Sequence, residues 1–221
     1  MRRLFTIVLV SMVSLFGITA CNSPFNVNGS GNVISETRQV SGFSSIDLRG
    51  FGDVTIQQGD TESLLIEGDD NIVPLLTSTV RDGQLILDTK NTIQIGNVTK
   101  LRFNVTVKEL DGINMSGAGN VMGADINTEK ITVRLSGTGN LTLSGTVGEQ
   151  DVELSGVGNY DGNAFASKQA HVRVSGLGNA GVRVSDDLDA LVSGMGSITY
   201  IGRPSTTKQI SGAGSIQHVN E

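Results

Sequence analysis

Short stretches of alternating apolar and polar residues recur along the C-terminal half of the chain. Ile113-Asn114-Met115, Val133-Arg134-Leu135, Val152-Glu153-Leu154 and Val172-Arg173-Val174 each read apolar, polar, apolar. Alternation with a period of two predicts a β-strand with one buried face. Leu141-Thr142-Leu143 keeps the same alternation just after a glycine-containing turn. The pattern therefore predicts pairs of short strands joined at sharp corners.

The corners share a five-residue motif, Ser-Gly-x-Gly followed by Asn or Ser. Successive copies are separated, serine to serine, by 20, 19, 20, 18 and 18 residues. A nearly constant period marks a repeat architecture, and about 19 residues suit one coil of a β-solenoid, in which equivalent strands stack in parallel at about 4.8 Å. Glycine reaches positive φ without steric cost, so the chain can turn sharply there. The six copies begin at Ser116, Ser136, Ser155, Ser175, Ser193 and Ser211.

In a parallel stack, the last residues of these motifs lie one above another. Side-chain amides at the strand spacing can hydrogen-bond to one another and to the corner backbone. We therefore expect a structural corner ladder, which consists of Asn120, Asn140, Asn159, Asn179, Ser197 and Ser215. Arg134, Glu153 and Arg173 form a second expected column, on the outer face, whose alternating charges set the register more than the stability.

The N-terminal half has a less regular pattern. Ile46-Asp47-Leu48 and Val54-Thr55-Ile56 flank a looser corner at Gly50, and the Asp82-Gly83 pair predicts a β-hairpin turn. The predicted fold class is all-β: a parallel β-helix or β-solenoid with about 19 residues per coil, preceded by a less regular β region. We place this N-terminal β region, which starts or caps the solenoid, at residues 33–110, and the repeat solenoid at residues 111–221.

The first residues of the chain predict export. Two arginines at positions 2 and 3 precede an apolar run from Leu4 to Gly17, which is short for a transmembrane helix and suits a signal peptide. Ile18-Thr19-Ala20-Cys21 resembles the bacterial lipobox, in which the cysteine thiol receives a diacylglycerol. We predict a lipoprotein signal peptide at residues 1–20, then the lipidated Cys21 and a tether through residue 32. The other interpretation of Cys21 is a free thiol in an exported protein.

Composition and charge restrict the partners. The chain has 221 residues, 29 of them glycine, no tryptophan and a net charge of −6. Removal of Arg2 and Arg3 with the signal peptide leaves the mature chain more acidic still, which argues against nucleic acid or anionic lipid as a partner attracted by charge. A lipid on Cys21 makes the membrane the first partner, because two acyl chains anchor firmly. Asn22 and Ser23 carry no acidic signal after the lipid, which favours the outer membrane.

Familiar kinds of chemical site fit the repeat poorly. Calcium-binding repeats need carboxylates at intervals of nine residues, whereas here the period is doubled and the motif ends in Asn or Ser. The acidic turns at Asp69-Asp70 and at residues 186–189 leave a single weak calcium site open, although such turns are usually solvated. A dinucleotide site needs a helix after its glycines, where strands are predicted here. His171 and His218 are expected on different faces or several coils apart. We predict no cofactor.

The variable corner residue is mostly apolar. In chain order it is Ala118, Thr138, Val157, Leu177, Met195 and Ala213. Exposed, these side chains would form a narrow apolar stripe of the kind that marks an interface, with Val157, Leu177 and Met195 as a possible interface column. Alternatively they fold over the corner and cover the edge of the coil, which is the interpretation we favour.

With these residues in view, the chain resembles the bacterial head-GIN-domain family, which carries the name of autotransporter adhesins. The matching stretches are residues 40–46, the segment Gly50-Phe51-Gly52-Asp53 with the strand after it, the hairpin at residues 80–85 and the repeated Ser-Gly-x-Gly-Asn. The similarity covers roughly residues 33–219. It implies a β-helix-like fold in the cell envelope, often behind a lipoprotein signal. The family offers no catalytic residues to carry over.

These observations lead to three hypotheses about function. The first is a non-enzymatic envelope lipoprotein, an adhesin or binding module that presents a rigid solenoid face to a glycan, a surface protein or a copy of itself. The second is a periplasmic scaffold that self-assembles. The third is a carbohydrate-active enzyme, for which the column Arg134, Glu153 and Arg173 would have to supply the chemistry. The polar C-terminal residues 217–221 discourage open-ended strand addition and so disfavour filaments.

Overall fold

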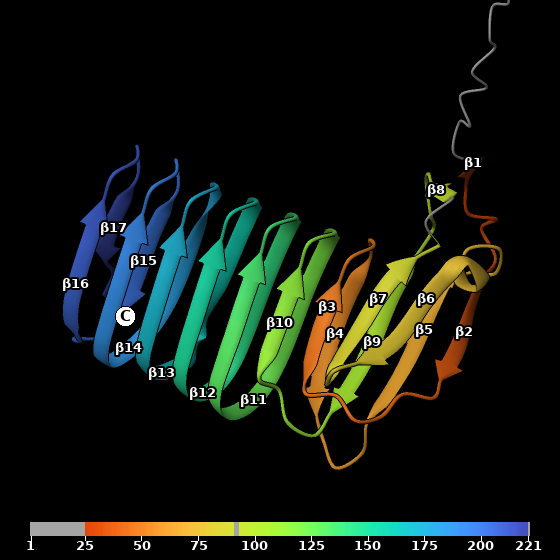
Figure 1. Ribbon diagram of the computed structural model, residues 1–221, viewed down its shortest axis with the longest axis horizontal. Coiled ribbons are helices and arrows are strands. Elements are labelled where there is room, and N and C mark those ends of the chain that lie inside the picture. Colours follow the sequence, from red (N-terminus) through yellow and green to blue (C-terminus); the bar gives the residue numbers. More distant parts are fainter. Residues whose placement is uncertain (1–24, 91–92, 221) are drawn as a thin grey trace, which may run out of the picture.

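Parallel strand pairing runs through most of the molecule. A computed structural model describes residues 25–90 and 93–220, and it has the elongated form of stacked β-coils shown in Figure 1. The glycine corners lie along the upper edge of this view and the return bends along the lower edge. The expected β-solenoid, preceded by a less regular β region, is confirmed. Cys21 and the signal peptide lie outside the described residues.

The regular coils occupy the C-terminal half. Four long strands each run from one glycine corner to the next, so the segment expected to be a variable return is itself paired as strand. The strands of this half, all paired in parallel, are β10 (Gly112–Met115), β11 (Ala118–Leu135), β12 (Thr138–Leu154), β13 (Val157–Val174), β14 (Leu177–Val192), β15 (Ser197–Ile201), β16 (Ser205–Ile210) and β17 (Ser215–His218).

Differences in coil length are taken up away from the corners. The motif residues stay in register throughout, with Asn120 opposite Asn140 and Asn140 opposite Asn159. Register shifts occur instead on the return side, between Gly123 and Ile126 in β11 and between Gly162 and Ala166 in β13. Because the extra residues lie on the return side, the register at the corners is preserved. A shift of one residue there would turn the buried side chains of a strand outward and the exposed ones inward.

The stack continues into the N-terminal half, but not in chain order. The strand β3 (Ser45–Leu48) lies between β10 and β7 (Gln84–Thr89) and pairs in parallel with both. In the same way, β4 (Asp53–Gln58) lies between β11 and β9 (Leu101–Val107) and pairs in parallel with both. The β3–β4 pair, with its corner at Phe51, therefore forms a coil that lies between the rung β7–β9 and the first regular coil. Phe51 is bridged to Ala118 across that boundary.

Antiparallel strands close the N-terminal end. On one face β6 (Leu76–Arg81) covers β7, and on the other β5 (Ser63–Asp69) covers β9 and is itself covered by β2 (Val33–Arg38). The predicted hairpin is confirmed as β6 and β7, with Asp82 and Gly83 both at positive φ. The remaining elements are a short pair, β1 (Phe25–Val27) with β8 (Ile93–Ile95), and a 3-10 turn, η1 (Val73–Leu75).

The segment expected to be a tether is part of the fold from Phe25 onward. Besides the β1–β8 pairing, the Ser30 hydroxyl donates to Asp70 Oδ1 at 2.6 Å, and the Gly31 amide donates to Asp69 Oδ1 at 2.8 Å. Asp69 is fully buried, which corrects the expectation of a solvated acidic turn. Its second carboxylate oxygen accepts from the Thr99 amide at 2.8 Å. Two adjacent aspartates thus fasten residues 30–32 to the end of the stack.

The core is a continuous column of aliphatic residues between the faces of the coils. Besides Asp47 and Asp69 near the N-terminal end, the buried polar residues of the described chain lie in the middle coils and form one chain of hydrogen bonds. Tyr160 Oη donates to Gln150 Oε1, Gln150 Nε2 donates to Ser167 Oγ, and Ser167 Oγ donates to the Arg183 carbonyl, each at 2.8 Å. Burial raises the pKa of Tyr160 far above its ordinary value, so the phenol stays a donor. Every buried side-chain polar atom in the described part of the chain has a partner.

In the described ranges there is no helix that has both the length and the apolar character needed to cross a membrane.

Candidate binding surfaces

The corner edge carries an ordered row of side-chain amides. Asn140 Nδ2 donates to Asn120 Oδ1 at 3.1 Å, Asn159 to Asn140 at 2.9 Å and Asn179 to Asn159 at 3.1 Å. The row continues when the Ser197 amide donates to Asn179 Oδ1 at 3.2 Å and the Ser215 hydroxyl donates to Ser197 Oγ at 3.1 Å. The structure thus brings all six residues of the expected ladder together. Every amide points its donor toward the N-terminal end of the stack.

The acceptor at the start of the ladder is a carboxylate that the sequence analysis missed. Asn120 donates both its side-chain and its backbone N–H to Asp53 Oδ1, at 2.9 and 3.2 Å. Asp53 ends the looser corner copy at Gly50, and this copy stacks directly on the first tight one. A carboxylate is a stronger acceptor than an amide, so it suits the end of the row. The alignment of Gly50-Phe51-Gly52-Asp53 with the motif was the available signal.

The glycines of the motif are required by close packing between coils. A Cβ on Gly137 would overlap the carbonyl oxygen of Gly117 in the coil below, and one on Gly139 would overlap that of Gly119. Gly139 also has φ of +147°, which disfavours any other residue. The repeated Gly-x-Gly therefore has a structural role: it allows the backbones of neighbouring corners to stack in direct contact.

The variable corner residues form an exposed apolar ridge, which we define as Val157, Leu177 and Met195. Val157 lies opposite Leu177 in the register, and 51%, 47% and 67% of the three residues' surfaces remain exposed. They correspond to the exposed-stripe interpretation rather than to the covered edge that we favoured. The ridge runs between the amide ladder and the column of exposed motif serines. The corner edge therefore offers apolar contact flanked by hydrogen-bonding groups.

The charged column on the outer face is present with one change of partner. Arg134 Nε lies 3.5 Å from Glu153 Oε2, whereas Arg173 reaches Asp151 at 3.6 Å instead of Glu153. Alongside it, Lys130 Nζ lies 2.8 Å from Glu149 Oε1, and this hydrogen bond lowers the pKa of Glu149 below its ordinary value. These are pairs between exposed side chains on neighbouring coils, the arrangement of a stacking column. They are not gathered around a cleft.

Candidate metal and catalytic groups lie apart or are already bound. Asp69 and Asp70 are engaged by residues 30–32 and Thr99, and the described residues contain no group of three His, Cys, Asp or Glu side chains that could hold a metal ion. His171 lies on the outer face, 3.9 Å from Glu149 and from Asp189. His218 lies in the last rung, with its ring 5.2 Å from that of Tyr200.

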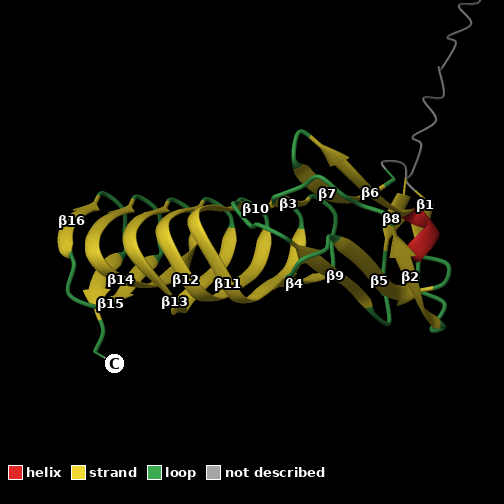
Figure 2. Ribbon diagram, turned by 90° about the horizontal axis from the view of Figure 1, so that it is seen from below, coloured by secondary structure: helices red, strands yellow, loops and turns green. Residues whose placement is uncertain are grey.

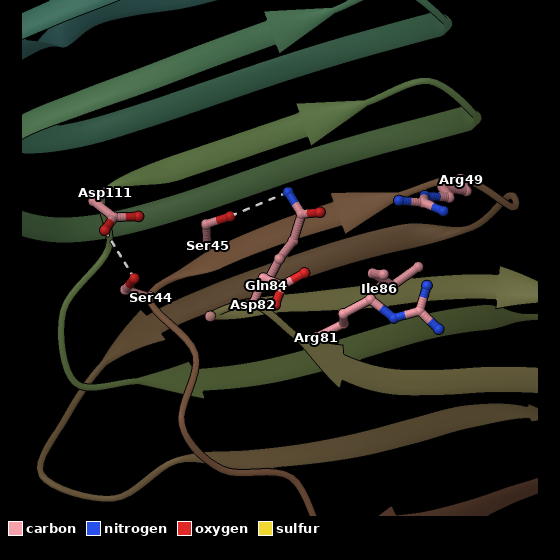
Figure 3. Close-up of a pocket in the computed structure, with 9 residues that line it drawn as sticks. Ser44, Ser45, Arg49, Arg81, Asp82, Gln84, Ile86 and Asp111 are labelled. Atoms are coloured by element: carbon pink, nitrogen blue, oxygen red, sulfur yellow. Dashed lines mark hydrogen bonds between the residues drawn. The ribbon is translucent and has the colours of Figure 1, made fainter.

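One small pocket contains two arginines near the hairpin (Figure 3). It measures about 350 Å³, and Arg49 and Arg81 lie on either side of Ile86. Arg49 is paired with the buried Asp47, which raises its pKa through a hydrogen bond and through its charge. The Ser44 hydroxyl donates to Asp111 Oδ2 at 2.8 Å at the other side of the pocket. Carboxylates therefore surround this pocket and offset its positive charge.

A longer groove lies on the return side, opposite the glycine corners. It measures about 500 Å³ and crosses four successive coils. Val147 and Val184 lie in its floor, and Lys168, Arg183 and Arg203 lie along it. The sequence analysis missed this groove, because its residues come from the return segments, which share no motif.

Comparison with known proteins agrees with this architecture. A crystal structure of a protein from Bacteroides fragilis, called a putative adhesin, matches with a TM-score of 0.72 and 24% identity over 87% of this chain and 100% of that one. A Parabacteroides distasonis protein, called a putative lipid binding protein, matches with a TM-score of 0.59 and 22% identity over 88% and 99% of the two chains. At these identities the matches show the fold. No curated protein sequence matches the chain.

The family comparison covers most of the coils. The model of the family described as "Putative auto-transporter adhesin, head GIN domain" matches residues 42–204, from just before β3 to the loop after β15. This range includes the looser corner at Gly50 and the first five tight copies of the motif, and it ends before the copy at Ser211. The chain therefore belongs to the head GIN domain family.

Proposed function

We propose that the protein is a non-catalytic, lipid-anchored envelope protein that binds an external surface through the corner edge of its solenoid. The observation that carries the proposal is the exposed apolar ridge of Val157, Leu177 and Met195, held in a straight row beside the amide ladder. Membership of a family described as adhesins supports a place at the cell surface or in the envelope. The anchor would be Cys21, in the outer membrane, and the partner a glycan or a surface protein.

The physical reason lies in the rigidity and spacing of the edge. Neighbouring coils repeat at about 4.8 Å, so the ridge and the ladder present the same groups at a fixed interval. A row that is already ordered loses little side-chain entropy on binding. Exposed apolar side chains that adjoin one another in a contiguous row, rather than singly, favour a contact site. The flanking amides and serine hydroxyls give hydrogen-bonding groups that a glycan or a peptide backbone can meet.

Surface exposure is the first test. Intact cells are treated with protease or with a membrane-impermeant label, and the protein is detected beside a periplasmic control. We expect labelling of the protein while the control stays protected. Protection of both until the outer membrane is opened would exclude adhesion and turn the search to periplasmic partners.

The anchor and the ridge are tested separately. Cys21→Ala is expected to abolish incorporation of labelled palmitate and to release the protein from the membrane fraction. Leu177→Asp with Met195→Asp is expected to reduce attachment of cells to their target surface, whereas Met122→Asp, a change at a residue that is 57% exposed but off the ridge, leaves attachment unchanged. Equal attachment by both variants would remove the ridge from the binding surface. A ridge variant that instead loses a dimer in sedimentation would favour self-assembly.

A further inference from the structure

The groove on the return side differs from the rest of the surface. Its residues lie halfway between successive glycine corners, on the side toward the viewer in Figure 2. The main hollow of about 500 Å³ adjoins a second of about 420 Å³, and the two share Thr146, Val147 and Lys168. Together they form a shallow channel along the axis of the stack, from Thr128 to Arg203.

The floor of the main hollow is apolar. Val147, Ser167 and Val184 lie opposite one another in three successive coils, and Ala166 lies beside them. The hydroxyl of Ser167 is turned inward, because it accepts from Gln150 Nε2 and donates to the Arg183 carbonyl, both at 2.8 Å. The hydrogen bonds of the Ser167 hydroxyl are therefore satisfied from within. Val147 and Val184 are only 5% and 1% exposed, so the apolar surface that a molecule in the groove meets comes from Ala166 and from the methylene stems of the cationic side chains that line it.

The rim of the same hollow is positively charged. Lys168, Arg183 and Arg203 line it, and none of the described residues that line it is acidic. This concentration of positive charge occurs in a protein with a net charge of −6. Arg183 is held in place, since its Nε donates to the Asn163 carbonyl at 2.9 Å. Glu129 lies only in the adjoining hollow, which Lys168 also lines, so the channel has both charges at that end and only positive charge toward Arg203.

We propose that this groove binds a single-chain anionic amphiphile, namely a free fatty acid. The carboxylate lies at the Arg203 end, and the acyl chain runs past Lys168 and over Ala166, along the row of Val147, Ser167 and Val184, toward Thr128. The four coils of the main hollow span roughly 14 Å at about 4.8 Å per step, a length that suits a straight acyl chain, and Thr128 belongs to the next coil along. Glu129 fixes the direction by repelling the carboxylate from the other end. An acidic oligosaccharide would meet the same cations but would gain little from apolar contact with Ala166 and the methylene stems of the lysine and arginines.

This site is independent of the corner edge. The groove and the ridge lie on opposite sides of each coil, so failure of one proposal leaves the other intact. The proposal also differs from lipidation at Cys21, which is covalent and lies at the other end of the chain.

The test is a titration of the purified full-length chain with dodecanoate below its micelle concentration, followed by calorimetry. We expect one dodecanoate to bind per chain, with acetate and the neutral dodecyl maltoside at least about tenfold weaker. Arg203→Glu and Lys168→Glu, both at exposed residues, are each expected to weaken dodecanoate binding by about fivefold, the upper range for one exposed charge pair. Lys108→Glu, an equal charge change at an exposed residue outside the groove, serves as the matched control.

Three results would overturn the proposal. The first is equal affinity for dodecanoate and dodecyl maltoside, which would remove the role of the cations. The second is equal loss of affinity in Lys108→Glu and Arg203→Glu, which would reduce the effect to net charge. The third is tighter binding of an oligogalacturonate than of dodecanoate, which would assign the groove to an acidic glycan instead.

Discussion

At the N-terminal end of the stack, antiparallel strands β2, β5 and β6 cover the last parallel rung, whereas at the C-terminal end the last rung, β16 and β17, faces solvent. The N-terminal end is thus closed by backbone pairing and by the buried Asp69. The C-terminal end uses side chains. Lys208 occupies the inward column of Val172 and Ala190, and its Nζ donates to Tyr200 Oη at 2.8 Å and lies 4.6 Å from the centre of that ring.

The two ends of the stack are terminated in different ways. Parallel stacking leaves an edge of free N–H and C=O groups at each end, and such an edge invites another chain to add. A different strand direction breaks the repeat at one end. A charged residue placed where the core column would continue breaks it at the other, because a further coil would have to bury that charge. Both devices favour a stack of fixed length over a filament.

A valine at a motif glycine should destabilise an interior corner much more than the terminal one. Gly137→Val places a side chain against the Gly117 carbonyl, with coils on both sides that cannot move apart, and we expect a loss of about 3 kcal/mol in the free energy of unfolding. Gly212→Val meets the Gly194 carbonyl in the same way, but the last rung can separate locally and the loss is expected to be smaller, about 1 kcal/mol. Urea denaturation measures both. Equal losses would show that the last rung is as firmly held as the interior.

Acid should open the N-terminal end first. Burial alone would raise the pKa of Asp69, but the backbone N–H donors of Thr99 and Gly31 outweigh the effect of burial and lower this pKa. Hydrogen bonds from the side chains of Ser30 and Asn32 lower the pKa of Asp70. Folded pKa values below the unfolded ones mean that this stabilisation is complete above the unfolded pKa and is lost as the pH falls through the folded values.

Hydrogen exchange, corrected for intrinsic rates, provides the measurement. Between pH 6 and pH 3, amides of residues 30–32 and 99–101 are expected to lose about tenfold in protection, while those of β12 and β13 change little. Asp69→Asn should show the same loss already at pH 6. Uniform loss of protection along the stack would contradict a role for these two aspartates.

The next prediction concerns association at the C-terminal end. Lys208→Leu restores an apolar residue to the inward column, and Ile210, already 49% exposed, then lies beside it. We expect the variant to form a dimer through its C-terminal end that grows no further, because the N-terminal end stays closed. Sedimentation velocity at several concentrations measures this, with the exposed Lys168→Leu as control. Longer polymers would show that the antiparallel cap does not protect its end.

The smallest effect concerns the ladder. Its amides end at Asn179, and hydroxyl residues continue it to the C-terminal end. Ser197→Asn would add an amide that can donate to Asn179 Oδ1, with an expected gain of about 0.5 kcal/mol in the free energy of unfolding. Thermal denaturation of the variant beside Ser193→Asn, a neighbouring exposed serine outside the ladder, checks it. A gain in both would assign the effect to the surface rather than to the ladder.

The corner motif made the regular coils predictable, because its glycines and its final Asn or Ser have the same structural role in every copy. Ser116 to Ser215 could be placed in register from their spacing alone. The same register contained a signal that was not used: 18 residues separate Ala190 from Lys208, which puts the lysine in the core column. The place of the amide ladder followed from the spacing, whereas its carboxylate end at Asp53 required a match that the looser copy obscured.

The remainder depended on contacts distant in sequence. The local sequence does not determine that β3 pairs with β7 and β10, since each of these strands has the same alternation of apolar and polar residues. The local sequence predicts a solvated turn at Asp69, because the donors that bury it, Gly31 and Thr99, lie 38 and 30 residues away. The groove could not be predicted from the sequence for a similar reason. Its floor and rim come from return segments of unequal length, and the register shifts in β11 to β13 determine how these segments align.

The displaced position of the β3–β4 coil has a consequence for the order of folding. Residues 45–58 are among the first to leave the ribosome, yet both their neighbours, β7–β9 and β10–β11, are made later, and the hydrogen bond between Asp53 and Asn120 spans 67 residues. Contacts of such separation form slowly. The early coil must therefore wait as an unpaired segment until its place between two later ones exists. The coils therefore cannot form in the order in which they are synthesised. Stacking of the coils has to begin in the middle of the sequence.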